Sequence, residues 1–338
     1  MMQVTQPDYY ESFHCIAGAC PDTCCVGWQV VLDQKHLEFY QSLDGDLGEQ
    51  IRSGIVYIDK EPSFSLCNGR CCMLRDDGLC KIQYELGEEA LSSVCGFYPR
   101  FVTELGLIRE QGLSISCPEV ARLVLNREEP LRCECFTVDE PLRFFHDVEP
   151  EVLLAVRQGR DRAIAVMQER TQPLAERLEK ILTIAQQIQG EEIGSSFEAV
   201  TQEEFEEFRT ALYELFLSLE ILRPDWKDLL QKGRQGKSVT SLNEETGWEQ
   251  LMCYHLFKYA LRSAMDDDFL EKICFGILGI LLLQDLYSQG GQELVFLVQL
   301  YAKEIEHNED NLDVIETAIR ENPHFSPYKL HRILRKFV

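Results

Sequence analysis

Cysteine is the residue type in this chain with the most evident chemistry. Of the fourteen cysteines, twelve lie within the first 135 residues, and they fall into three groups. The groups are Cys15, Cys20, Cys24 and Cys25; then Cys67, Cys71, Cys72, Cys80 and Cys95; and then Cys117, Cys133 and Cys135. Thiolates grouped in this way bind zinc or an iron–sulfur cluster, or they pair as disulfides, depending on the redox state of the compartment.

The first fifteen residues bear on that choice. The segment MMQVTQPDYYESFHC has no basic region, no apolar run and no small-residue cleavage site, so it does not read as a secretory signal. We therefore expect a cytoplasmic protein. In a reducing compartment, cysteines at this density favour a metal or a cluster over disulfides.

The spacing of the cysteines narrows the kinds of site. The patterns Cys15-x4-Cys20-x3-Cys24-Cys25 and Cys71-x8-Cys80-x14-Cys95 form short loops that can fold several sulfurs around one centre. The two-residue spacing of zinc ribbons is absent. The radical S-adenosylmethionine pattern, Cys-x3-Cys-x2-Cys, is also incomplete, because Gly27 occupies its third position.

Composition excludes several partners. The net charge is −24, and both halves of the chain are acidic, so we expect no binding to nucleic acid. We also expect no insertion into a membrane. The most apolar stretch, from Phe269 to Tyr287, carries Glu271, Lys272 and Asp285, which is typical of a buried core helix.

The chain divides by composition into two parts. A length of 338 residues suggests two domains. We place a cysteine-rich domain at 1–135, a linker with Pro141 and Pro150 at 136–150, and an all-α helical domain at 151–338. The predicted fold class is mainly α, with a metal-stabilised N-terminal half that contains few short strands, followed by a helical bundle.

Local patterns predict individual elements. In the first half, Trp28 to Asp33 reads as a buried strand, and Leu107 to Ser116 as a hairpin that turns at Gln111-Gly112. In the second half, one helix runs from Pro173 to Gly190, and another follows the Thr201/Glu204 capping box until Pro224. Further helices are predicted at about 247–264, 267–288, 292–307, 309–321 and 327–336.

Longer segments resemble a known family. FHCIAGACPDTCCVGWQVVLD at 13–33, DDGLCKIQYELGEEALSSVCGFYPR at 76–100 and LSISCPEVARLVL at 113–125 are similar to the flagellin lysine-N-methylase family. WKDLL at 226–230 and KEIEHNEDNL at 303–312 are also similar to family segments. The resemblance therefore extends over most of the chain.

The resemblance implies an enzyme that methylates lysine side chains of flagellin, with S-adenosylmethionine as the donor. It also implies an iron–sulfur centre in the cysteine-rich part, to which zinc is the alternative. The cysteines that match the family segments, and hence the implied metal ligands, are Cys15, Cys20, Cys24, Cys25, Cys71, Cys80, Cys95 and Cys117.

Methyl transfer also needs polar groups. A lysine is almost wholly protonated at neutral pH, so burial or a nearby base must remove its proton. Among the polar residues of the family-like segments, the catalytic candidates are Tyr98, Glu119 and Glu304. Arg100 and Arg122 are candidates for binding the donor's carboxylate, and ion pairs that brace the cysteine loops are the alternative.

Three interpretations remain open from the sequence. For Glu304, Glu306 and His307, which end a helix, the alternative to a functional role is a solvated face. Because no strand–GxGxG–helix fingerprint is present, the donor pocket cannot be placed. The alternative functions are a metal-binding redox or chelating protein without methyltransferase activity, and an adaptor with a structural zinc.

Overall fold

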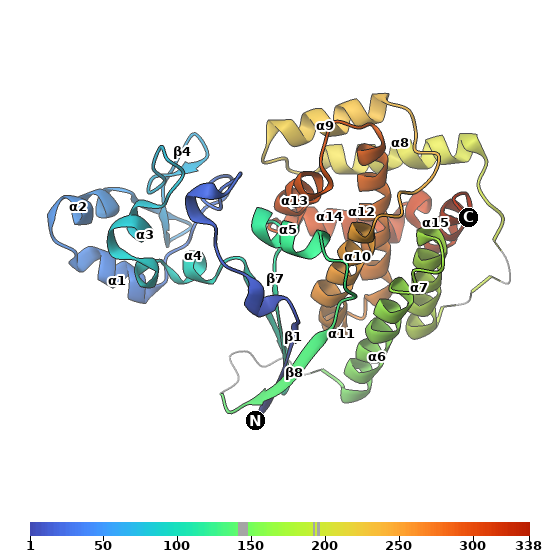
Figure 1. Ribbon diagram of the computed structural model, residues 1–338, viewed down its shortest axis with the longest axis horizontal. Helices are drawn as coiled ribbons and strands as arrows, with labels where there is room; N and C mark the ends of the chain where they lie inside the picture. The colour runs from blue at the N-terminus through green and yellow to red at the C-terminus, as the bar shows by residue number, and fades with distance from the viewer. Residues whose placement is uncertain (141–147, 192, 195–196) are drawn as a thin grey trace.

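The computed structural model describes residues 1–338 except 141–147, 192 and 195–196. The cysteine-rich residues form a small lobe on one side of the molecule, and a larger helical body lies on the other (Figure 1). Helices dominate the described residues and the strands are short, so the prediction of a mainly α fold is confirmed.

A four-stranded sheet connects the two regions. Its strand order is β6-β7-β1-β8, with β1 parallel to β7 and antiparallel to β8. The bounds are β1 (Met2–Pro7), β6 (Arg100–Leu105), β7 (Ile108–Leu113) and β8 (Cys133–Val138).

The hairpin of β6 and β7 corrects one prediction. Its turn lies at Gly106 and Leu107 and not at Gln111-Gly112, because Gly106 takes a φ of +58° that favours glycine. Gly112 lies within β7 for a different reason. A Cβ atom at Gly112 would come 2.4 Å from Cζ of Phe101, so this glycine makes room for the facing ring.

Short elements make up the cysteine-rich lobe. The predicted strand at Trp28–Asp33 is wrong, since only Val31 forms an isolated bridge, to Ser63. Asp33 instead caps the first helix, where its carboxylate accepts the backbone N–H of His36 at 3.1 Å. The elements are α1 (Gln34–Ser42), α2 (Gly45–Ser53), β2 (Ile55–Ile58), β3 (Glu61–Phe64), β4 (Leu66–Cys67), β5 (Arg70–Cys71), α3 (Lys81–Leu86) and α4 (Ser93–Phe97).

Most of the remaining described residues are helical. The helices are α5 (Pro118–Leu125), α6 (Pro150–Met167), α7 (Leu174–Gln189), α8 (Gln202–Ser218), α9 (Pro224–Gln235), α10 (Thr246–Tyr259), α11 (Ser263–Asp266), α12 (Phe269–Ser288), α13 (Leu294–Ile305), α14 (Glu309–Glu321) and α15 (Pro327–Arg335). The capping box at Thr201 and Glu204 is present, and Gly190 ends α7 with a φ of +72°. Pro224 begins α9, whereas α8 already ends at Ser218, so the predicted end of that helix was too late.

Two apolar cores are formed. The smaller core lies in the cysteine-rich lobe, around Tyr40, Ile51 and Phe64. The larger core packs residues from β6, β7 and α5 against the helices that follow. The predicted division at 1–135, 136–150 and 151–338 stays a prediction. β8 extends into the predicted linker as far as Val138, and residues 141–147 of that linker lie outside the described residues.

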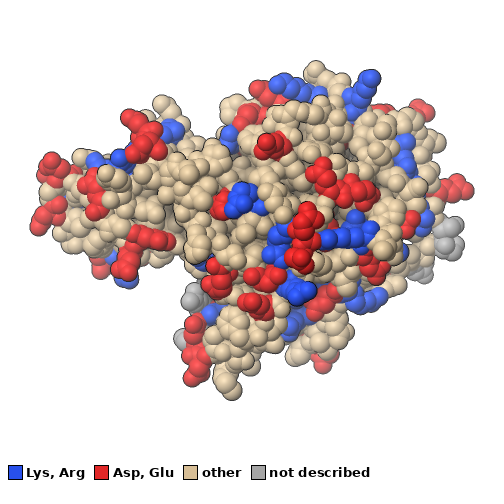
Figure 2. All heavy atoms as spheres, viewed as in Figure 1, with Lys and Arg blue, Asp and Glu red and all other residues tan. Residues whose placement is uncertain are grey.

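Two further findings concern partners. No helix within the described ranges is both long and apolar enough to cross a membrane. Acidic and basic side chains are mixed over the face shown in Figure 2, so this view shows no continuous basic surface.

Candidate functional site

Seven of the eight family-like cysteines line one cavity. The cavity has a volume of about 350 Å³ and lies between the cysteine-rich lobe and the start of α5. We call it the cysteine cavity, and its cysteines are Cys15, Cys20, Cys24, Cys25, Cys80, Cys95 and Cys117. Cys71, the eighth, does not line the cavity. It lies in β5, where its N–H donates to the carbonyl oxygen of Cys25 at 2.8 Å.

Helix starts and tight loops bring these cysteines together. Cys15 to Cys25 form one loop, which we call the cysteine loop, with a single turn of 3₁₀ helix at Ala17–Ala19. Cys80 and Cys117 are the N-cap residues of α3 and α5. Cys95 lies in the first turns of α4, and its N–H donates to the hydroxyl of Ser92 at 3.4 Å. The sequence can therefore place each sulfur locally, but only the packing of the three segments forms the cavity.

Burial controls the protonation of the thiols. It raises the pKa of Cys95 and of Cys117 to about 11, and it raises the pKa of Cys80 as well. Cys25 is different, because a hydrogen bond from the Cys24 thiol lowers the pKa of Cys25 to about 7. A cationic centre would be needed to keep the sulfurs of Cys80, Cys95 and Cys117 as thiolates.

The cysteines that line the cavity are possible ligands for a metal ion or a metal cluster. Among the described residues, no group of three or more His, Cys, Asp or Glu side chains is arranged around one metal ion. Thiolates are the ligands of iron–sulfur clusters, which have several iron atoms and need ligands on more than one side. The cysteines that line the cavity supply this type of ligand.

Two of the predicted polar residues lie at the cavity. Tyr98 and Arg100 both line it, on either side of Pro99. The Tyr98 hydroxyl lies 3.1 Å from the Ser116 hydroxyl, and the Arg100 guanidinium lies 5.6 Å from the centre of the Phe13 ring. The Arg100 guanidinium thus lies near the ring of Phe13, which also lines the cavity.

The other predicted polar residues lie elsewhere. Glu119 and Arg122 form an ion pair of 2.6 Å within α5, and Arg122 is exposed. Glu304 is buried in α13, and its carboxylate accepts the N–H of Leu222 at 2.8 Å. Burial raises the pKa of Glu304 to about 7. Glu304 is not on a solvated face, and neither it nor the Glu119–Arg122 pair lines the cysteine cavity.

A buried lysine that sequence reasoning missed holds the cysteine loop. The Lys303 ammonium on α13 donates to Asp22 and to the carbonyl oxygen of Thr23, each at 2.9 Å, and it lies 5.0 Å from the Trp28 ring. Gln299, one turn earlier, donates to the same Asp22 carboxylate at 3.1 Å. In the sequence, the available signal was Gln299 and Lys303, four residues apart and therefore on one face of a mostly apolar helix.

A larger open groove adjoins the cysteine cavity. It has a volume of about 830 Å³ and shares Cys20, Asp22 and Thr23 with the cavity. Its walls are the cysteine loop, the turn between β4 and β5, and the start of α9. The charged residues that line it are Asp22, Arg70, Asp76, Asp77, Arg223 and Asp225. Ion pairs hold three of the four carboxylates: Asp22 pairs with Lys303 and Arg223, Asp77 with Arg75, and Asp225 with Arg223.

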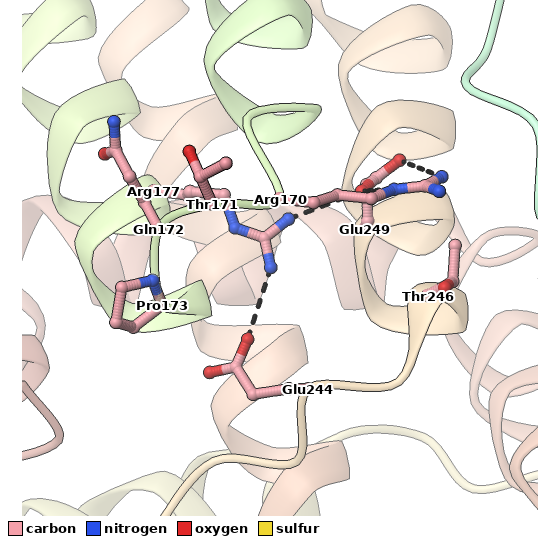
Figure 3. A pocket seen from close by; sticks show the side chains of 8 residues that line it. All are labelled: Arg170, Thr171, Gln172, Pro173, Arg177, Glu244, Thr246 and Glu249. Atoms are coloured by element: carbon pink, nitrogen blue, oxygen red, sulfur yellow. Dashed lines mark hydrogen bonds and ion pairs between the residues drawn. The ribbon is translucent and has the colours of Figure 1, made fainter.

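A second pocket is built from ion pairs in the helical body. Figure 3 shows Arg170 facing Glu249 and Arg177 facing Glu244, with nitrogen–oxygen distances of 2.8 and 3.3 Å. Glu244 also accepts the N–H of Leu174 at the start of α7. These charges neutralise one another and join α7 to α10, so the pocket has a structural role.

The fold and the site define a mainly α protein with a thiol-lined cavity between a cysteine-rich lobe and a helical body. The chain is 33% identical over 130 residues to the flagellar biosynthetic protein FliU of Salmonella muenchen, an alignment that covers 36% of this chain and 77% of FliU. The chain belongs to the flagellin lysine-N-methylase family.

Two further relatives are lysine-N-methylases by name. The lysine-N-methylases of Salmonella typhimurium and Salmonella choleraesuis are each 33% identical to this chain over 130 residues. These alignments cover 36% of this chain but only 32% of each methylase, so the chain matches about a third of their length. No protein-family model matches the chain. No solved structure matches it either.

Proposed function

We propose that this protein transfers methyl groups from S-adenosylmethionine to lysine side chains of flagellin, and that the cysteine cavity holds an iron–sulfur centre. The observation that carries the proposal is the convergence of seven family-like cysteines on one cavity, together with Tyr98 and Arg100. The printed names of the relatives, a flagellar biosynthetic protein and two lysine-N-methylases, support the substrate and the reaction.

Arg100, Tyr98 and the cavity cysteines have different roles in this proposal. When bound, S-adenosylmethionine supplies an electrophilic methyl group on a sulfonium. Arg100 offers a guanidinium that suits the carboxylate of such a donor. The groove beside the cavity, with a volume of about 830 Å³, would receive a lysine-bearing segment, and Tyr98 supplies a hydroxyl-bearing side chain to the cavity wall. The cavity cysteines would hold the iron–sulfur centre.

The test is a methylation assay on the whole chain. Anaerobically purified protein is incubated with flagellin and labelled S-adenosylmethionine, and flagellin lysines are analysed by mass spectrometry. We expect labelled methyl-lysine, with iron and acid-labile sulfide in the purified protein. Iron without methyl transfer would favour the redox or chelating alternative, and colourless protein with stoichiometric zinc would favour the adaptor.

A pair of cysteine variants tests the role of the cavity. Cys95→Ser removes a sulfur from the cavity wall, whereas Cys135→Ser removes an exposed one in β8. We expect Cys95→Ser to lose iron and at least tenfold in methylation, because serine is a poor ligand for iron, and Cys135→Ser to keep both. Equal iron content in the two variants would contradict the assignment of the cavity as the cluster site.

A further inference from the structure

A continuous chain of hydrogen bonds leads from the wall of the cysteine cavity into the helical body. The Tyr98 hydroxyl lies 3.1 Å from the Ser116 hydroxyl, which lies 2.8 Å from the Ser114 hydroxyl. Ser114 in turn donates to the carboxylate of Glu306 at 2.9 Å. Tyr98 and Ser116 line the cavity, Ser114 does not, and both serines are buried. The chain therefore connects the reaction space to a carboxylate behind its wall.

Counting protons gives this chain a direction. Ser114 has one hydroxyl proton, and it goes to Glu306, so Ser114 must accept from Ser116. Ser116 then gives its own proton to Ser114 and accepts from Tyr98. The Nε2 atom of His307 also lies 2.7 Å from the Ser116 hydroxyl. Because the Ser116 proton goes to Ser114, Nε2 of His307 must donate a hydrogen bond to the Ser116 oxygen. Each hydroxyl on the path thus donates toward Glu306.

Glu306 is a buried carboxylate that several donors hold in place. Lys258 donates to its carboxylate at 2.6 Å and Tyr254 donates at 2.9 Å, and the side chain is almost fully buried. The Lys258 ammonium itself is enclosed by the rings of Phe101, Tyr254 and Tyr259, with centroids 5.3 to 5.8 Å away. The titratable groups around Glu306 are Lys258, Tyr254, His255 and Tyr259 from α10, Tyr301 from α13, and the adjacent His307.

We propose that Glu306 receives the proton that the substrate lysine must lose, by way of the Tyr98 hydroxyl and the two serines. This proposal rests on the proposed function. An N–H bond of the substrate ammonium breaks, and its electron pair stays on nitrogen. Each hydroxyl along the path takes one proton and passes on its own, and the carboxylate of Glu306 becomes a carboxylic acid. An ammonium and a carboxylate become an amine and an acid, so no further reactant is needed.

The proposal predicts a change in the pH profile of methylation. At pH 7 only roughly one free lysine in a few thousand is neutral, because its pKa is ~10.4. Without the proton relay from Tyr98 through Ser116 and Ser114 to Glu306, the enzyme depends on the small fraction of substrate lysine that is already neutral. Glu306→Gln should therefore lower kcat by about 10²-fold at pH 7, and the loss should shrink about tenfold per pH unit up to pH 9. Damage to the fold would not be repaired by raising the pH.

The experiment uses the unaltered enzyme, Glu306→Gln, Tyr98→Phe and the control Glu321→Gln, an exposed residue at the end of α14. Tyr98→Phe interrupts the path and leaves Lys258 paired with Glu306, so it remains informative if Glu306→Gln unfolds. Methylation of flagellin is measured from pH 6.5 to 9. We expect both path variants to converge on the unaltered enzyme at high pH and the control to match it throughout.

Other outcomes overturn the proposal in distinguishable ways. Path variants whose profiles run parallel to that of the unaltered enzyme would show that Glu306 takes no proton from the substrate. A loss that is repaired at high pH in His307→Gln but not in Glu306→Gln would assign the proton to His307. No methylation by the unaltered enzyme at any pH would overturn the proposed function, and the relay with it.

Discussion

Two carboxylates near the end of α13, only two residues apart, serve different purposes because their partners differ. Glu306 receives hydrogen bonds from Ser114, Tyr254 and Lys258 and stays close to the cysteine cavity. Glu304 points to the other side and fixes Leu222, just before α9. The same residue type therefore belongs to the candidate site in one case and to the scaffold in the other.

Glu304 makes the stability of the protein depend on pH. Burial raises the pKa of Glu304 from 4.5 to about 7, so its charge destabilises the folded state. The neutral Glu304 side chain stabilises the folded state. This stabilisation is fully present below pH 4.5 and is lost as the pH rises through about 7. Glu304→Gln removes this dependence. Between pH 5 and 8, the free energy of unfolding of the variant should rise relative to the unaltered protein by up to about 3 kcal/mol.

Urea unfolding at both pH values measures this difference. Glu203→Gln, at an exposed position in the first turn of α8, is the control and should show little change with pH. If Glu304→Gln and the unaltered protein lose stability equally between pH 5 and 8, the carboxyl group is not the source of the dependence.

At the scale of elements, α6 presents a glycine to a side chain of α7. A Cβ atom added at Gly159 of α6 would come 1.9 Å from Cδ1 of Ile188 in α7. These helices belong to the larger core, which also contains α12. A glycine within a helix costs helix stability, and here the close packing of two helices compensates for it.

Gly159→Ala should therefore destabilise the protein although alanine is the better helix former. We expect a loss of about 1–3 kcal/mol, because Ile188 must leave its preferred position. Thermal unfolding followed by circular dichroism measures the effect. Gln158→Ala, on the exposed side of the same helix, is the control and should change stability little. A stabilised Gly159→Ala would mean that the two helices can separate at no cost.

At the scale of the whole molecule, the cysteine-rich lobe is held to the helical body through the cysteine loop. Asp22 on that loop receives hydrogen bonds from Lys303, Gln299 and Arg223, all of which belong to the helical body. The Lys303 ammonium lowers the pKa of Asp22 against the opposing effect of burial. The geometry of the cavity thus depends on residues outside the cysteine-rich lobe.

Breaking this contact should loosen the cavity. Lys303→Met leaves Asp22 without its most buried partner, and the expected loss of stability is on the order of 3 kcal/mol. We also expect Cys20 and Cys24 to react faster with a maleimide in protein freed of metal, which mass spectrometry of the peptides measures. Lys227→Met, exposed on α9, is the control. Unchanged labelling in Lys303→Met would show that other contacts fix the loop.

The sequence by itself determined the local features of this protein. The capping box at Thr201, the C-terminal glycine at Gly190 and the proline at Pro327 define helix ends, because each acts on the backbone within a few residues. The cysteine groups were visible for the same reason, and seven of the eight chosen cysteines line the cavity. The hairpin was the exception: its turn was predicted at Gln111-Gly112 but lies at Gly106-Leu107.

Only the tertiary structure decided which residues meet across the chain. Lys303 and Asp22 are 281 positions apart, and Ser114 and Glu306 are 192 apart. No periodicity connects such pairs, since their contact arises only when α13 packs beside the cysteine loop and the segment after β7. The same packing excludes Cys71 from the cavity and buries Glu304. Local propensities fix where each side chain lies on its own element, and the packing of the elements fixes what it faces.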